Sequence, residues 1–155
     1  MLVIPETLLD EIVALARDEA PGEVCGWLGG EGGRVLRVYP VPNVAEDPKS
    51  GFRMDPEAQL RAMREIREAG LDLTGTYHSH PRTPSEPSVR DLQLGLYPDC
   101  LHLIVSLAAG GPEFQAFRAP PVAPGAGGSF CAPRDATWQR QPVEITRRTR
   151  PLPGS

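Results

Sequence analysis

TYHSHPRTPSEPSVRD, residues 76–91, contains two of the three histidines of the protein, His78 and His80. On an extended strand, side chains at positions i and i+2 point to the same face, so both imidazoles can approach one metal ion. A loop with three prolines follows, and it leads to a predicted helix start at Ser88 that can bring Asp91 back toward the two rings. Two histidines and one carboxylate, with water in the fourth position, are an arrangement typical of catalytic zinc.

Each of these residues also has an ordinary structural explanation. A His-x-His pair can result from packing alone, and Ser88 can serve only as a helix N-cap. Asp91 in a first helical turn can simply interact favourably with the helix dipole. The combination is more specific than any one part, because a proline directly follows the two histidines and Ser-x-x-Asp begins after seven intervening residues.

Two helices are predicted ahead of this stretch. Thr7 is the expected N-cap of the first helix, which should end at about Ala20, before a proline. The second helix has a strong start signal, with Asp55 as N-cap and proline at the first position, and Gly70 should end it. Its buried side chains are predicted to be Leu60, Met63 and Ile66.

Short apolar runs separated by turn residues predict the strands. They cover residues 24–28, 34–41, 71–79, 101–107 and 113–118. The first two should form a hairpin through a glycine-containing turn, and the last two an antiparallel pair. Strands and helices in this order indicate an α/β domain. For its sheet we expect a mixed, largely antiparallel and curved arrangement flanked by helices.

Composition narrows the class of protein. A chain of 155 residues fits one domain with a real core. A net charge of −4 without a long run of Lys or Arg gives no reason to expect a nucleic-acid partner. No segment reaches the roughly 18 apolar residues of a membrane span. The N-terminus does not resemble a signal peptide. We therefore expect a cytoplasmic protein, and the oligomeric state stays open.

The remaining histidine and the cysteines are expected to have structural roles. His102 lies inside an apolar run and is expected to be a satisfied core or edge histidine rather than a ligand. Three widely spaced cysteines form neither a disulfide framework nor a Cys-x-x-Cys site, so they are expected to be buried reduced thiols. They are Cys25, Cys100 and Cys131. A nucleophilic role for Cys25 has no specific support.

Composition shifts after residue 119. Residues 120–155 are rich in proline and glycine and hold few large apolar residues, which indicates an extension that wraps the surface or stays mobile. Trp138 and the run 143–146 could form one docked strand. We expect a domain over residues 1–119 and a separate C-terminal extension.

The motif resembles that of the JAMM (MPN+) metallopeptidase family. This family carries a Glu, then His-Ser-His-Pro, then seven residues to Ser-x-x-Asp, and the chain matches it at Glu23, residues 78–81, Ser88 and Asp91. Glu23 also begins a Glu-x-Cys-Gly sequence that looks like the one in prokaryotic members. The resemblance covers about residues 1–119. It implies the JAMM/MPN-like α/β/α fold, which is related in architecture to cytidine deaminases.

The resemblance also implies a mechanism. His78, His80 and Asp91 would bind one Zn²⁺ with water as the fourth ligand, and the ion would lower the pKa of that water. Glu23 would take the water proton and pass it to the leaving amine, while Ser88 would hydrogen-bond the oxyanion. The small prokaryotic members are associated with ubiquitin-like sulfur carriers, so the implied substrate is the C-terminal tail of a ubiquitin-like or sulfur-carrier protein.

Two alternatives come from other classes. Many MPN domains have lost their metal ligands and serve as scaffolds, but this sequence keeps the ligands and also Glu23, which a scaffold does not need. A zinc deaminase would require His-x-Glu and Pro-Cys-x-x-Cys, and neither sequence is present. The expected function is therefore a zinc-dependent peptidase or isopeptidase, with the non-catalytic scaffold as the alternative.

Overall fold

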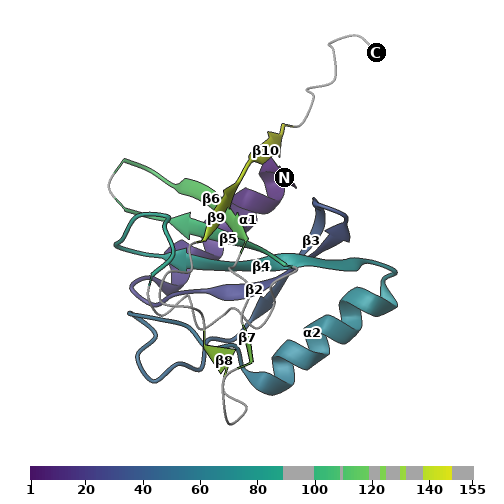
Figure 1. Ribbon diagram of the computed structural model, residues 1–155. Helices are drawn as coiled ribbons and strands as arrows, with labels where there is room; N and C mark the ends of the chain where they lie inside the picture. The colour runs from purple at the N-terminus through teal and green to yellow at the C-terminus, as the bar shows by residue number, and fades with distance from the viewer. Residues whose placement is uncertain (89–99, 109, 119–122, 125–129, 132–137, 148–155) are drawn as a thin grey trace.

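A computed structural model describes residues 1–88, 100–108, 110–118, 123–124, 130–131 and 138–147 (Figure 1). The elements are β1 (Leu2–Pro5), α1 (Glu6–Glu19), β2 (Cys25–Glu31), β3 (Arg34–Val41), α2 (Pro56–Glu68), β4 (Asp72–His80), β5 (Leu101–Ser106), β6 (Glu113–Arg118), β7 (Ala123–Pro124), β8 (Phe130–Cys131), β9 (Gln139–Gln141) and β10 (Val143–Thr146). Among these residues, no helix is long and apolar enough to cross a membrane.

One mixed sheet of eight strands forms the centre of the molecule, in the order β10-β1-β3-β2-β4-β5-β6-β9. Pairs β1–β10, β1–β3 and β4–β5 are parallel, and the other four pairs are antiparallel. The short pair β7–β8 forms a second sheet. The predicted mixed, curved sheet with flanking helices is confirmed.

A single C-terminal segment, residues 139–146, reaches both edges of this sheet. Its first half, β9, pairs antiparallel with β6, and its second half, β10, pairs parallel with β1. Pro142 separates the two strands, and its carbonyl accepts a 2.8 Å hydrogen bond from the Leu2 amide. The sheet is consequently curved and nearly closed, with β10 also in contact with β6 (Figure 1).

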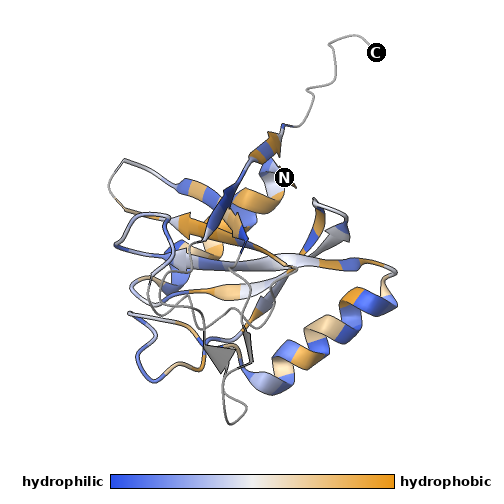
Figure 2. Ribbon diagram, viewed as in Figure 1, coloured by the Kyte–Doolittle hydropathy of each residue, from blue (hydrophilic) through white to orange (hydrophobic). Residues whose placement is uncertain are grey.

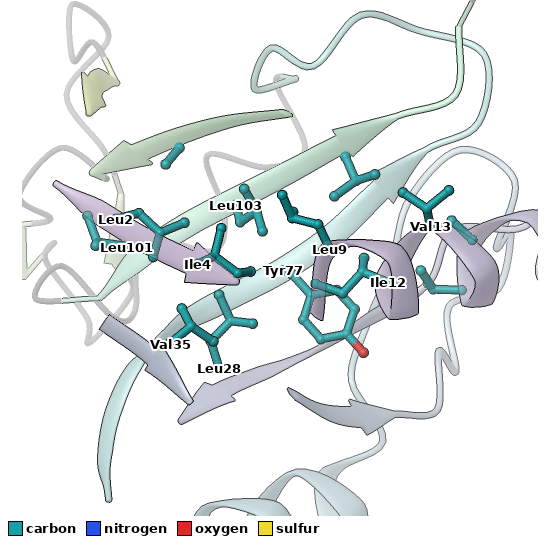
Figure 3. Packing of buried hydrophobic residues seen from close by; sticks show 14 residues of the cluster. Leu2, Ile4, Leu9, Ile12, Val13, Leu28, Val35, Tyr77, Leu101 and Leu103 are labelled. Atoms are coloured by element: carbon teal, nitrogen blue, oxygen red, sulfur yellow. The ribbon is translucent and has the colours of Figure 1, made fainter. Parts of the chain in front are cut away.

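Helix α1 covers one face of the sheet and encloses the larger apolar core. Leu9 and Ile12 of the helix pack toward Tyr77, which is completely buried (Figure 3). The ring of Tyr77 lies directly over Gly26 in the neighbouring strand, where an added Cβ would come within 2.5 Å of Tyr77 Cε1. Glycine is required at this position because any side chain would displace the aromatic ring.

Helix α2 covers the opposite face. Trp27 and Leu28 are adjacent on β2, so they point to opposite sides of the sheet, and Trp27 belongs to the cluster under α2. Ala62 and Ile66 are the buried residues of the helix in that cluster. Figure 2 shows alternating hydrophobic and hydrophilic residues along α2, as expected for a helix with one packed face. Thr76 pairs with Trp27 and so lies on the α2 side, as do His78 and His80.

The start and end of α2 confirm the sequence prediction. The Asp55 side chain is the N-cap and accepts a 3.0 Å hydrogen bond from the Ala58 amide. Gly70, just past the helix, has a φ of +73°, which a residue with a side chain rarely adopts. The predicted buried stripe is wrong at Leu60, which is 64% exposed, because it lies on the solvent side of the helix while Ala62 takes the buried position.

The N-terminus differs from the sequence prediction. The helix begins at Glu6 with Pro5 in the N-cap position and no capping side chain, so the assignment of Thr7 as N-cap is wrong. The sequence analysis also missed strand β1, in which Leu2 and Ile4 are fully buried. Four residues are too few to show a clear alternation, and pairing with β3 and β10 stabilises the strand instead.

Candidate active site

His78 and His80 lie at the end of β4, and both side chains are buried on the α2 side of the sheet. Their rings approach edge to face, with centroids 4.9 Å apart. The two Nε2 atoms are separated by 3.1 Å. The prediction that the alternate positions of a strand bring both imidazoles together is confirmed.

This arrangement fits a tetrahedral metal ion. With Zn–N bonds of 2.0–2.1 Å, two nitrogen ligands of a tetrahedral zinc are about 3.3 Å apart, close to the observed separation of 3.1 Å. His80 Nδ1 lies 2.8 Å from the carbonyl oxygen of Pro84, which can only accept. A neutral His80 therefore carries its proton on Nδ1 and has a lone pair on Nε2, the atom that faces His78. A hydrogen bond of this kind is the usual orienting contact of a metal-binding histidine.

Phe52 packs against the imidazole of His78. Its ring stacks on His78 with a centroid distance of 4.5 Å and an interplanar angle of 30°. The stacked ring limits rotation of the imidazole and shields one of its faces. The sequence analysis did not identify Phe52 as part of the site. The available signal was the single aromatic residue in the loop of residues 42–55.

Glu23 immediately precedes β2 and is largely buried, with 9% of its surface exposed. Cys25 pairs with His78, and Val24 is hydrogen-bonded to Ser79, so Glu23 lies one residue beyond these contacts, at the end of β2 that is next to the histidines. Its backbone is fixed on both sides, since its amide donates to Pro48 O at 2.7 Å and its carbonyl accepts from Asn43 Nδ2 at 2.9 Å. A surface carboxylate would not need such support.

Ser79, between the two histidines, points to the other side of the sheet as predicted. Its hydroxyl oxygen accepts a 2.8 Å hydrogen bond from the Val24 amide, and its own amide donates to the Val24 carbonyl at 3.0 Å. These two bonds join the end of β4 to the residue that follows Glu23. Ser79 thus fixes the position of the backbone next to Glu23 relative to the end of β4, where the histidines lie.

Ser88 and Asp91 complete the predicted set. Ser88 is exposed at the end of the described segment 1–88, and Asp91 lies outside the described residues, as does the predicted helix that begins at Ser88. Within the described part of the chain, no third His, Cys, Asp or Glu joins the histidine pair to form a metal-binding group. The roles of all five predicted site residues therefore remain predictions.

Cys25 is a buried thiol beside the site. Burial, and then the negative charge of Glu23, raise the pKa of Cys25 to about 12. Its Sγ contacts the Val41 carbonyl at 3.4 Å. Since a nucleophilic cysteine reacts as the thiolate, a thiol with this pKa is unsuited to attack a substrate near neutral pH. Cys100 is likewise free and buried, in agreement with the sequence analysis.

His102 is the third histidine, and the structure confirms that it is part of the core. Its Nδ1 is hydrogen-bonded to Thr76 Oγ1 at 2.8 Å, across the parallel pair β4–β5. The ring of Trp138 meets it edge to face at 5.2 Å. His102 is thereby enclosed between the sheet and the C-terminal segment.

Comparisons with known proteins agree with this geometry. The family described as prokaryotic homologs of the JAB domain matches residues 5–119. The chain belongs to this family. A desampylase from Haloferax volcanii is 38% identical over 103 residues, which are 63% of this chain and 74% of that protein. A probable TtuB-protein conjugate cleaving protease from Thermus thermophilus is 42% identical over 94 residues, 60% of this chain and 62% of that protein.

A solved structure resembles the chain over almost its whole length. The solution structure of protein DSY2949 from Desulfitobacterium hafniense has a TM-score of 0.75 and 31% sequence identity, and the match covers 96% of this chain and 94% of that one. The predicted JAMM/MPN-type fold is confirmed for this JAB-domain protein.

Proposed function

We propose that this JAB-domain protein is a zinc-dependent isopeptidase or peptidase that cleaves at the C-terminus of a ubiquitin-like protein of the sulfur-carrier type. The observation that carries the proposal is the buried pair of histidines with Nε2 atoms 3.1 Å apart, one of them oriented by a backbone carbonyl. The names of the two relatives, a desampylase and a conjugate-cleaving protease, support hydrolysis of a bond to a modifier protein.

We assign the metal to His78, His80 and Asp91. When bound, zinc would supply a Lewis acid that polarises the scissile carbonyl and makes a water molecule acidic near neutral pH. The carboxylate of Glu23 is proposed to accept the proton of the attacking water and deliver it to the amine nitrogen as the carbon–nitrogen bond breaks. The Ser88 hydroxyl is proposed to donate a hydrogen bond to the carbonyl oxygen as negative charge develops on it.

The positions of these residues support their roles. Glu23 precedes β2 at the end of the strand that pairs with the histidine end of β4, and its backbone is held by Pro48 and Asn43. A buried carboxylate close to a candidate metal site is well placed to act on water, because few solvent molecules compete for it. Ser88 is exposed, and an exposed hydroxyl can reach a substrate that arrives from solution.

A non-catalytic scaffold is the second candidate. A scaffold would have the same fold but would not need to bind zinc. The retained Glu23 argues against it, because burial of a carboxylate is costly and has no evident benefit for assembly.

Zinc content separates the two candidates without knowledge of the substrate. The protein and its His78→Ala variant would be purified in the same way and analysed for zinc per chain. About one zinc in the wild type and much less in the variant is the expected result. Zinc in neither protein, even after zinc is added back, would contradict the proposal and favour the scaffold.

A further inference from the structure

We propose that Ser106 is a positioning residue for the metal ligand His80 and acts through the backbone of Thr83 and Pro84. The inference rests on the metal site proposed above. It concerns the loop of residues 81–88, which leads from the histidine pair to Ser88. Two described side-chain hydrogen bonds join this loop to the β5–β6 hairpin, and the one made by Ser106 reaches the loop residue nearer to His80 in the sequence.

Ser106 stands directly beside His80 in the sheet. The two residues are partners in the parallel pair β4–β5, so their side chains lie on the same face. Ser106 is completely buried. Its hydroxyl donates to the Thr83 carbonyl at 2.5 Å and accepts from the Ala108 amide at 3.1 Å. Because the hydroxyl both donates and accepts a hydrogen bond, it has one orientation and holds the loop in a fixed position.

The supported peptide group is adjacent to the one that orients the imidazole. Ser106 binds the carbonyl of Thr83, and the next carbonyl, that of Pro84, accepts the 2.8 Å hydrogen bond from His80 Nδ1. Proline fixes one of the two backbone angles between these carbonyls, so little freedom separates them. Displacement of the Thr83 carbonyl would therefore move the Pro84 carbonyl and change the direction of the His80 ring.

Other contacts hold the ends of the same turn. The Leu107 amide donates to the His80 carbonyl at 3.0 Å and continues the pairing of β4 with β5. Beyond the turn, the buried Ser85 hydroxyl donates to Glu113 Oε2 at 3.4 Å. The latter bond is long, and it is made to a residue at the start of β6. Ser106 is consequently the strongest side-chain anchor of the turn among the described residues.

Zinc affinity tests the proposal. The dissociation constant would be measured by competition with a chromogenic chelator for wild type, Ser106→Ala and Ser106→Thr. The Ala variant should bind zinc about tenfold more weakly, at the lower end of the effect of losing an outer partner of a ligand. The Thr variant keeps the hydroxyl and should stay near wild type. Unchanged affinity in Ser106→Ala would overturn the proposal.

Thr74→Val is the matched control. Thr74 is also buried in β4, and its hydroxyl has no hydrogen-bond partner among the described residues. Removing this hydroxyl should leave zinc affinity unchanged. A loss equal to that in Ser106→Ala would mean that the effect is general to buried hydroxyls of the sheet, and it would also overturn the proposal.

A second measurement needs no metal. In the zinc-free protein, the Nδ1 proton of His80 should give an observable NMR signal that exchanges slowly with water, because it is buried and bonded to Pro84. In Ser106→Ala this proton should exchange faster, while the control should match wild type. An unprotected proton in the wild type would overturn the proposal even if the variants failed to fold. A wild type that has this signal but binds no zinc would instead contradict the proposed function.

Discussion

His102 and the pair His78 and His80 lie on the same face of the sheet and are all buried, yet their neighbours give them different roles. Nδ1 of His102 is hydrogen-bonded to Thr76, and the ring of Trp138 meets its ring edge to face. In the pair, the Nε2 atoms face each other instead. The difference depends on the partner of each ring nitrogen and not on residue type or burial.

Replacement of Glu23 by glutamine tests its proposed role as general base. Glutamine has nearly the same shape but cannot accept the proton, so cleavage should fall by about 10²–10⁴. Zinc content should not change, because Glu23 is not a proposed ligand. Both quantities would be measured with a ubiquitin-like fusion as substrate, with Glu19→Gln, an exposed carboxylate at the end of α1, as control. Cleavage near the wild-type rate in Glu23→Gln would contradict the mechanism.

Cys25 should make stability sensitive to alkaline pH. Its pKa is raised from 9.0 to about 12 in the folded protein, so the thiol begins to ionise near pH 9 only in the unfolded chain. Its contribution to stability is complete below pH 9 and is lost as the pH rises toward 12. Between pH 8 and pH 10, the free energy of unfolding should fall by on the order of 1 kcal/mol more in the wild type than in Cys25→Ala.

Urea unfolding at the two pH values measures this difference. The comparison with Cys25→Ala removes the effect of other groups, including Tyr77, whose pKa burial also raises. An equal fall in both proteins would show that the thiol ionises as readily in the folded state as in the unfolded chain.

A helix or strand was predicted correctly where residues next to it in the sequence determine its ends. The α2 boundaries were predictable because Asp55 caps the helix with its own side chain and Gly70 provides the backbone angle that ends it. The β2–β3 hairpin, with its glycine turn, was predictable for the same reason. The start of α1 and strand β1 were not, since neither has a local signal and Pro5 takes the place of a capping side chain.

The cap of α2 gives a direct test. Asp55→Ala removes the hydrogen bond to the Ala58 amide and should lower the free energy of unfolding by about 1 kcal/mol. Glu65→Ala, an exposed substitution on the same helix, should have little effect because alanine is a good helix former. The two variants would be compared by chemical denaturation. Equal stability of Asp55→Ala and wild type would show that the cap is not needed once α2 is packed.

For the candidate site, spacing predicted the pair of histidines because a strand has a fixed period of two residues. It could not predict Phe52, which stacks on His78, or Ser106, which is paired with His80 in the neighbouring strand. Their contacts depend on tertiary structure, and neither the aromatic residue in the loop nor the serine at the strand end shows in the sequence which residue it will contact. Sequence therefore identified the groups that face one another but not the groups that hold them in place.

The sheet is closed by pairing between the N-terminal strand β1 and the C-terminal strand β10. We propose that residues 120–155 are an extension of the family domain and that residues 139–146 dock by closing the sheet. The expected docked strand at residues 143–146 is confirmed as β10. Its partner could not be predicted, because the pairing of β10 with β1 joins positions more than a hundred residues apart. The polar, mostly exposed residues of β9 gave no sign that this strand would pair with β6. The family match ends at residue 119, although the segment is built into the sheet.

Truncation tests the closure of the sheet. A chain ending at residue 137 lacks β9 and β10, which removes seven paired positions of the two ladders together with the cover of Trp138 over His102. The loss should be on the order of 3 kcal/mol, or roughly 10 °C in Tm. The exposed edges of β1 and β6 should also promote association, visible as a mass that increases with protein concentration. A chain ending at Arg147 keeps both strands and is the control, expected to match the full protein in Tm and mass. If the shorter chain were as stable and as monodisperse as this control, the C-terminal segment would be an accessory to a sheet that is complete without it.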